Sequence, residues 1–290
     1  MEATNDDAGL TLEFENLHLG EEPKIESNFK GFKLFLPAVS VGNVGQLAMD
    51  LLLSNLPEKS PPVKIGRMFH PSLEPVVGLD IHTQNGLMTS CEVFLVKELQ
   101  YVIIHFHSPV TMKGRTEFVN SLVEWIGKQK FSQVVCFTSI FAEDRIDPQL
   151  VGIPFRYLAT DGTPELLTQM LQDLEWKQLE KRQFPAPAVM DNTEKNDNEG
   201  VLHLPGSGIT KLLYEECQLQ KIPFLALIMF ASEGDNTPEA MTMFQMADRI
   251  FGFRKSTSTN QDISPGGRDR MIVPISWTHL GEHNHSSSLY

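Results

Sequence analysis

Short apolar segments alternate with amphipathic segments along most of this chain, and this alternation restricts the fold more than any other feature. Residues 224–230 are all apolar, and residues 101–106 are interrupted by a single histidine. Strands of this kind are typical of parallel sheets that are buried on both faces. Residues 115–129 instead place their apolar side chains on one face of a helix. We therefore predict an α/β fold, organised as a single three-layer α/β/α domain.

The ends of these elements follow from the turn-forming residues beside them. Pro37, for example, ends the first apolar segment. We expect strands at residues 32–36, 64–69, 91–96, 101–106, 134–137, 155–158 and 224–230. We expect helices at residues 44–52, 115–129, 164–174 and 206–217, and a further helix from residue 237.

Composition divides the chain into four segments. Residues 1–28 are acidic and lack clustered apolar residues, so we expect a flexible leader before a domain at residues 29–255. Residues 181–200 are rich in Pro, Asn, Asp and Glu and are predicted to form a disordered loop. Residues 256–290 are predicted to form a C-terminal arm that docks locally and ends in a free tail.

The charge balance restricts the partners. The chain has 37 Asp and Glu against 24 Lys and Arg, which gives a net charge of -13. Such a surface repels phosphate backbones and anionic lipid headgroups, and no long run of Lys and Arg reverses this. We therefore expect no nucleic acid and no membrane as partner, and a basic protein surface instead.

Two further features predict where the protein works. No apolar stretch reaches the roughly 20 residues that a membrane span needs, and residues 1–20 lack the order of a signal peptide. Cys91, Cys136 and Cys217 have no CxxC spacing, so we expect reduced, buried thiols. Both features predict a cytoplasmic and nuclear location.

Two turns that contain glycine precede predicted helices. One includes Gly42, Asn43 as a candidate N-cap, and Gly45; the other includes Gly208 and Lys211. Turns of this kind can present backbone N–H groups to a phosphate at a helix N-terminus. Neither has the spacing of a Walker A loop or of GxGxxG. A structural role and an anion site both remain open, and no cofactor is predicted.

The sequence contains no recognisable catalytic constellation. Ser139, Ser232 and Cys136 are candidate nucleophiles, but none lies in a GxSxG elbow or in a cysteine-protease signature. Cys136 lies within a predicted strand, where a small apolar residue is expected. We therefore assign no catalytic residue.

Two other groups of side chains have alternative interpretations. His105 and His107 alternate onto one face of a strand and could share a metal, but no third ligand is linked to them by spacing. Glu233 and Asp235 flank Gly234 before a predicted helix, where they could act as acid and base or interact with the helix N-terminus. We favour the second role for the carboxylates and predict no metal site.

Leu289 and Tyr290 are the last two residues of the sequence and follow three serines. An apolar residue and an aromatic ring next to an α-carboxylate can enter a pocket that contains a lysine. A frayed tail is the alternative interpretation.

Four segments together resemble one protein family. They are residues 36–50 with Pro37, Gly42, Asn43 and Gly45, residues 154–158, residues 208–214 with Gly208 and Lys211, and residues 232–240 with Glu233, Gly234 and Asp235. Over about residues 31–245, this ordered pattern resembles the proteasome assembly chaperone 2 family. We expect these motif residues to be structural.

The resemblance implies a fold and a function. It implies an α/β fold similar to nucleoside phosphorylases, without enzymatic activity. It also implies a heterodimer with proteasome assembly chaperone 1 that promotes formation of the α-subunit ring of the 20S proteasome and prevents off-pathway ring association. Members of the heterodimer use tails similar to the hydrophobic-Tyr-any residue ending of proteasome activators, whereas here Tyr290 is last. The alternative function is a nucleoside- or phosphate-binding enzyme of phosphorylase-like fold.

Overall fold

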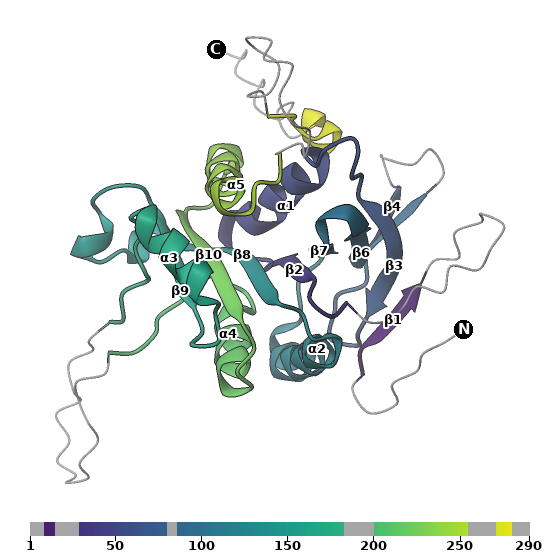
Figure 1. Ribbon diagram of the computed structural model, residues 1–290, viewed down its shortest axis with the longest axis horizontal. Coiled ribbons are helices and arrows are strands. Elements are labelled where there is room, and N and C mark those ends of the chain that lie inside the picture. Colours follow the sequence, from purple (N-terminus) through teal and green to yellow (C-terminus); the bar gives the residue numbers. More distant parts are fainter. Residues whose placement is uncertain (1–8, 15–28, 80–85, 183–199, 255–270, 280–290) are drawn as a thin grey trace, which may run out of the picture.

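The protein forms one mixed sheet with helices on both faces (Figure 1). The computed structural model describes residues 9–14, 29–79, 86–182, 200–254 and 271–279. The sheet has eight strands in the order β1-β3-β6-β7-β2-β8-β10-β9. They are β1 (Thr11–Phe14), β2 (Lys33–Pro37), β3 (Val63–Phe69), β6 (Cys91–Val96), β7 (Tyr101–Phe106), β8 (Gln133–Phe141), β9 (Phe155–Ala159) and β10 (Phe224–Ala231). A separate hairpin pairs β4 (Val77–Leu79) with β5 (Leu87–Thr89).

The centre of the sheet is parallel. β2 pairs in parallel with both β7 and β8, and β8 pairs in parallel with β10. The flanking strands β6 and β9 are antiparallel to their neighbours. The loops that follow β2, β8 and β10 therefore lie at one edge, which we call the carboxyl edge of the sheet.

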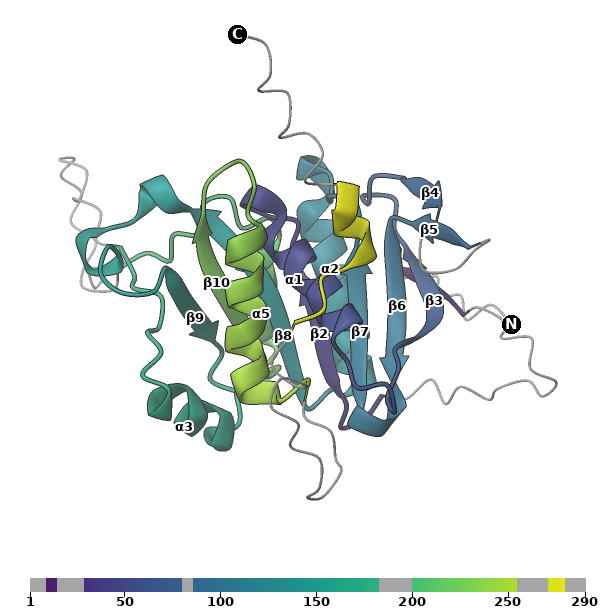
Figure 2. The ribbon, with the colours of Figure 1, turned by 90° about the horizontal axis from the view of Figure 1, so that it is seen from above.

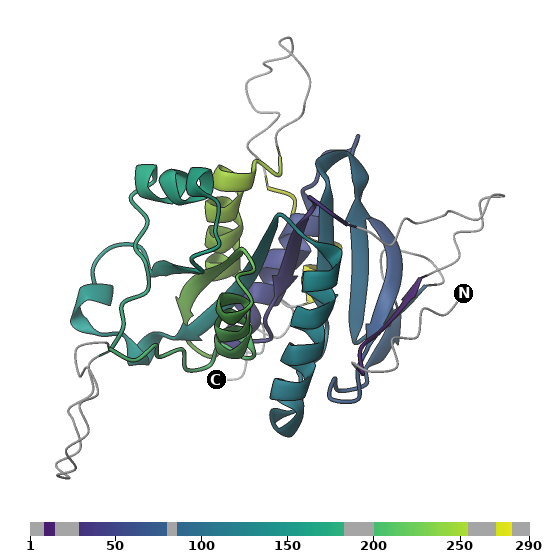
Figure 3. The ribbon, with the colours of Figure 1, turned by 60° about the horizontal axis from the view of Figure 1, so that its bottom comes forward.

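Alternation along the central strands divides the core into two halves. In β2, Leu34 and Leu36 pack into one half and Phe35 into the other, and all three are fully buried. The first half is covered by α2 (Arg115–Gln129) and α4 (Thr210–Leu219). The second half is covered by α1 (Val44–Ser54), α3 (Glu165–Asp173) and α5 (Thr237–Phe251). Figure 2 shows the layer of α1 and α5, and Figure 3 shows the layer of α2 and α4, so the predicted three-layer α/β/α class is confirmed.

The most periodic segments match their predicted bounds. The structure has β6, β7 and α2 at the predicted residues 91–96, 101–106 and 115–129. The prediction of a flexible leader over residues 1–28 is wrong for Thr11–Phe14, which pair antiparallel with Gly66–Phe69 of β3. Four residues are too few to show the alternation of a strand in the sequence, and this strand is stabilised by backbone hydrogen bonds to β3. None of the described helices is long and apolar enough to cross a lipid bilayer.

Candidate functional site

The turn between β2 and α1 fits closely against the neighbouring loops. Gly42 has a φ of +64°, and a Cβ atom there would lie 2.2 Å from Nδ2 of Asn236. A Cβ on Gly45 would lie 2.4 Å from the carbonyl oxygen of Phe137, in the middle of β8. Asn43 also has a positive φ, of 54°, and its side chain makes no capping hydrogen bond. Asn43 therefore occupies the predicted N-cap position of α1, but without a side-chain cap, and the turn uses the tolerance of Asn for left-handed backbone conformation.

The second glycine turn is filled in the same way. Gly208 has a φ of +62°, and a Cβ there would lie 2.2 Å from the carbonyl oxygen of Val39. The hollow beside it, lined in part by Val39, Gly208 and Ile209, has a volume of about 20 Å³. This is room for one water and not for a phosphate. Lys211 forms an ion pair with Glu215 on the same helix, at 3.9 Å. The geometry of this turn therefore favours the structural role over the anion site.

The turn before α5 packs against the first of these turns, through Asn236. The buried Asn236 donates from Nδ2 to the carbonyl oxygens of Ser232 and Gly234, at 2.8 and 3.0 Å. Asp235 accepts the N–H of Thr237 through Oδ1 at 3.0 Å. Hydrogen bonds from the side chain and the N–H of Thr237 lower the pKa of Asp235. Asp235 thus interacts with the N-terminus of the helix, which is the role favoured from the sequence over acid–base chemistry. Pro37, the last residue of β2, pairs with Phe137 of β8.

Two of the candidate nucleophiles are enclosed. Ser139 is fully buried, and its Oγ lies 2.8 Å from Oγ of Ser40. Burial raises the pKa of Cys136 to about 12, so its thiol stays protonated at neutral pH. Cys91, Cys136 and Cys217 are buried free thiols, as predicted.

The two histidines of the predicted pair each contact a carboxylate. Their rings are stacked with centroids 4.2 Å apart; Nε2 of His105 lies 2.7 Å from Oδ1 of Asp50, and Nε2 of His107 lies 3.2 Å from Oε2 of Glu92. Burial raises the pKa of Asp50, but hydrogen bonds from His105 and Trp277 outweigh it and hold the pKa below its ordinary value. Among the described residues, no group of three or more His, Cys, Asp or Glu is arranged to hold a metal.

The same Asp50 anchors the C-terminal arm, residues 271–279. Nε1 of Trp277 donates to Oδ2 of Asp50 at 3.1 Å, and the indole is buried in the second half of the core. The side chain of Asn55 both accepts from and donates to the backbone of Ile272, each at 2.8 Å. The arm therefore runs along α1 from its end toward its middle. Sequence reasoning missed Asp50 and Asn55, although the return of apolar residues at 272–277 indicated that the arm docks locally. Leu289 and Tyr290 lie outside the described residues.

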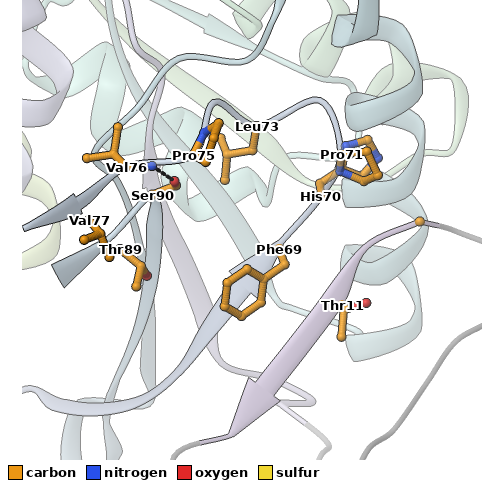
Figure 4. A pocket seen from close by; sticks show the side chains of 11 residues that line it. Thr11, Phe69, His70, Pro71, Leu73, Pro75, Val76, Val77, Thr89 and Ser90 are labelled. Atoms are coloured by element: carbon orange, nitrogen blue, oxygen red, sulfur yellow. Dashed lines mark hydrogen bonds between the residues drawn. The ribbon is translucent and has the colours of Figure 1, made fainter. Parts of the chain in front are cut away.

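A groove of about 600 Å³ opens between β3 and the β4–β5 hairpin, lined mainly by apolar side chains (Figure 4). Its titratable lining residue, His70, is buried and accepts the N–H of Ser72 through Nδ1 at 3.0 Å. Its ring stands edge-on to Phe118 at a centroid distance of 5.2 Å. Burial lowers the pKa of His70, against a smaller raising effect of Glu117. His70 therefore serves the packing of the groove wall as a neutral ring.

The neutral state of His70 predicts a pH dependence. The pKa of His70 in the folded state lies below the usual 6.5 of the unfolded state. The neutral ring therefore contributes its full stabilisation above pH 6.5, and this contribution is lost as the pH falls from 6.5 through the folded-state pKa. We expect the free energy of unfolding to fall as the pH is lowered from about 7.5 to about 5.5. His70 accounts for at most about 1.4 kcal/mol of this decrease per pH unit. In urea titrations, His70→Asn, which keeps an acceptor and does not titrate, should show a shallower fall. Parallel curves for the two proteins would contradict this assignment.

Comparisons with known proteins agree with this architecture. The PAC2 family model matches residues 34–262. Proteasome assembly chaperone 2 of Nematostella vectensis is 40% identical over 222 residues, which cover 75% of this chain and 88% of that protein. Proteasome assembly chaperone 2 of Xenopus tropicalis is 35% identical over 250 residues, which cover 84% and 90%.

A solved structure has the same fold. The crystal structure of Pyrococcus furiosus PbaA, an archaeal homolog of proteasome-assembly chaperone, matches with a TM-score of 0.57 at 12% identity. The match covers 94% of this chain and 93% of that chain, and at this identity it supports the fold alone. Since the family model spans most of the sequence and relatives at 35% and 40% identity match over most of their lengths, this chain belongs to the PAC2 family.

Proposed function

We propose that this protein is a non-enzymatic assembly chaperone of the 20S proteasome. It acts in the cytoplasm and nucleus as a heterodimer with proteasome assembly chaperone 1, promotes formation of the α-subunit ring and prevents off-pathway ring association. The observation that carries the proposal is the match to proteins named proteasome assembly chaperone 2 over 88% and 90% of their lengths.

The geometry supports a role without bond chemistry. The glycine turns at the carboxyl edge are filled by Asn236 and by backbone, and the hollow beside Gly208 has a volume of about 20 Å³. Cys136 and Ser139 are fully buried. Such a protein works by presenting surface to its partners, and its affinity must differ between the assembling particle and the mature one so that it can leave.

Co-purification tests the proposal directly. The full chain, isolated from its native cells, should bring down the sister chaperone and proteasome α subunits. Recovery of neither would overturn the proposal. Thermal unfolding with phosphate and a panel of nucleosides tests the enzymatic alternative, because a ligand that binds the folded state raises the unfolding temperature. We expect no shift.

The docked arm gives the tail a defined starting point. Trp277 and Ile272 are held on α1, so the segment that ends in Leu289 and Tyr290 departs from a fixed position. We propose that these two residues insert into the α ring, although the ending differs from that of proteasome activators.

Removal of the tail residues should separate two activities. Deletion of Leu289 and Tyr290 is expected to weaken recovery of α-ring intermediates about tenfold, while heterodimer formation is unchanged. Ser288→Ala is the matched control, since it keeps both residues and the tail length. Equal recovery with the deletion and with the control would show that the tail is passive.

A further inference from the structure

The segment that follows β8 exposes three large apolar side chains close together in the chain. Leu150, Val151 and Ile153 are 56%, 70% and 53% exposed, whereas Gln149 just before them is 3% exposed. Exposed apolar side chains are ordinary when scattered, but contiguous ones mark interaction surfaces. We call residues 150–153 the apolar loop.

A buried arginine holds the apolar loop in place. Arg156 of β9 is 1% exposed, and its Nε lies 3.1 Å from both carboxylate oxygens of Glu180. Its remaining nitrogens donate to the carbonyl oxygens of Pro148, Ile153 and Phe155, at 3.1, 3.5 and 2.9 Å. The guanidinium therefore binds the backbone on both sides of the apolar loop.

Gln149 completes this network. Its Nε2 donates to Oε2 of Glu180 at 2.8 Å, and its Oε1 accepts the N–H of Ile146 at 3.1 Å. A buried ion pair seldom stabilises a fold more than apolar residues of the same volume would, because both charges lose their hydration. Here the network instead fixes one conformation of the loop above it, and pre-ordering lowers the entropic cost of binding.

Charge and position indicate what the apolar loop contacts. Glu143, Asp144 and Asp147 precede it, so a complementary surface would have an apolar hollow edged by Lys or Arg. The loop follows the carboxyl end of β8, and the arm runs along α1 back toward that same edge, from Ile272 on Asn55 to Trp277 on Asp50. Figure 2 shows the arm, in yellow, reaching this edge.

We infer that the apolar loop is a second anchor on the proteasome α subunits, in addition to the tail, and that it contacts an apolar hollow with a basic rim. The inference rests on the proposed function and names residues 150–153 as a source of binding energy for the α subunits. Two contacts on one molecule raise the effective concentration of each for the other.

Paired variants test the inference in the full chain. Leu150→Asn with Val151→Ser removes the apolar surface without touching the arginine network, and Leu166→Asn on α3, where Leu166 is 75% exposed, is the matched control. Purified heterodimers would be titrated with purified α subunits. We expect the double variant to bind about tenfold more weakly and the control to bind like the unmodified protein. Asp147→Lys should also weaken binding and reduce its salt dependence.

The remaining outcomes separate the inference from the proposed function. Unchanged affinity of the double variant would overturn the inference and leave the proposed function standing. Loss of heterodimer formation would assign the loop to the sister chaperone and overturn the inference as well. If the unmodified heterodimer bound no α subunit, both the proposed function and the inference about the apolar loop would be overturned.

Discussion

Gly208→Ala is expected to lower the free energy of unfolding by about 3 kcal/mol, because the new methyl group meets both backbone strain and a fixed neighbour. The residue has a φ of +62°, and the methyl carbon would lie 2.2 Å from the carbonyl oxygen of Val39. That oxygen belongs to the backbone between β2 and α1, so it moves only if both elements move. Urea unfolding followed by circular dichroism measures the loss.

Gly31→Ala is the matched control for this substitution. Gly31 also has a positive φ, of +85°, but a Cβ there would meet nothing within 4 Å. We expect a loss of about 1 kcal/mol from backbone strain alone. Equal losses at the two positions would contradict the close packing of the Gly208 turn and would leave room there for a ligand.

Most of the fold was predictable because burial leaves a periodic pattern in sequence. The helix at residues 115–129 is long enough for its period to be unambiguous, and the continuous apolar run at residues 224–230 has the length of a buried strand; the structure has α2 and β10 there. β1 left no such pattern, since its four residues are held by hydrogen bonds to β3. Backbone pairing with a distant strand depends on register, which a short segment does not reveal.

The candidate site was less predictable, because its contacts join residues far apart in the chain. Gly42 was identified as part of a turn, but its neighbour Asn236 follows almost two hundred positions later. The contacts of Asp50 with His105 and Trp277 likewise join a helix, a strand and the C-terminal arm. Arg156 had a detectable signal, since a charged residue inside an apolar strand indicates a buried partner. The identity of that partner, Glu180, required the fold.

Arg156→Met is expected to lower the free energy of unfolding by about 3 kcal/mol, at the lower end of the range for breaking a buried ion pair. The loss is limited because the Glu180 side chain is 28% exposed and can regain water. Burial raises the pKa of Glu180, but hydrogen bonds from Gln149 and Arg156 outweigh it and hold the pKa below 4.5. A carboxylate of this kind stabilises the folded state above its unfolded pKa, and that stabilisation is lost as the pH falls through the folded value. The variant should therefore lose less stability on acidification than the unmodified protein, as acid titration of the unfolding free energy would show.

Two further substitutions distinguish loop ordering from simple charge pairing. Arg254→Met removes an ion pair whose arginine side chain is 28% exposed, against 2% for Arg156, and whose Nε lies 2.8 Å from Oδ2 of Asp248; it should cost less than about 1 kcal/mol. Arg156→Lys keeps the charge beside Glu180 but lacks the planar set of donors that reaches the carbonyls of Pro148 and Phe155. If the arginine orders the apolar loop, the lysine variant should bind α subunits more weakly even where its fold is intact. Full binding by a folded Arg156→Lys protein would mean that the ion pair alone, without the carbonyl contacts, is enough to present the loop.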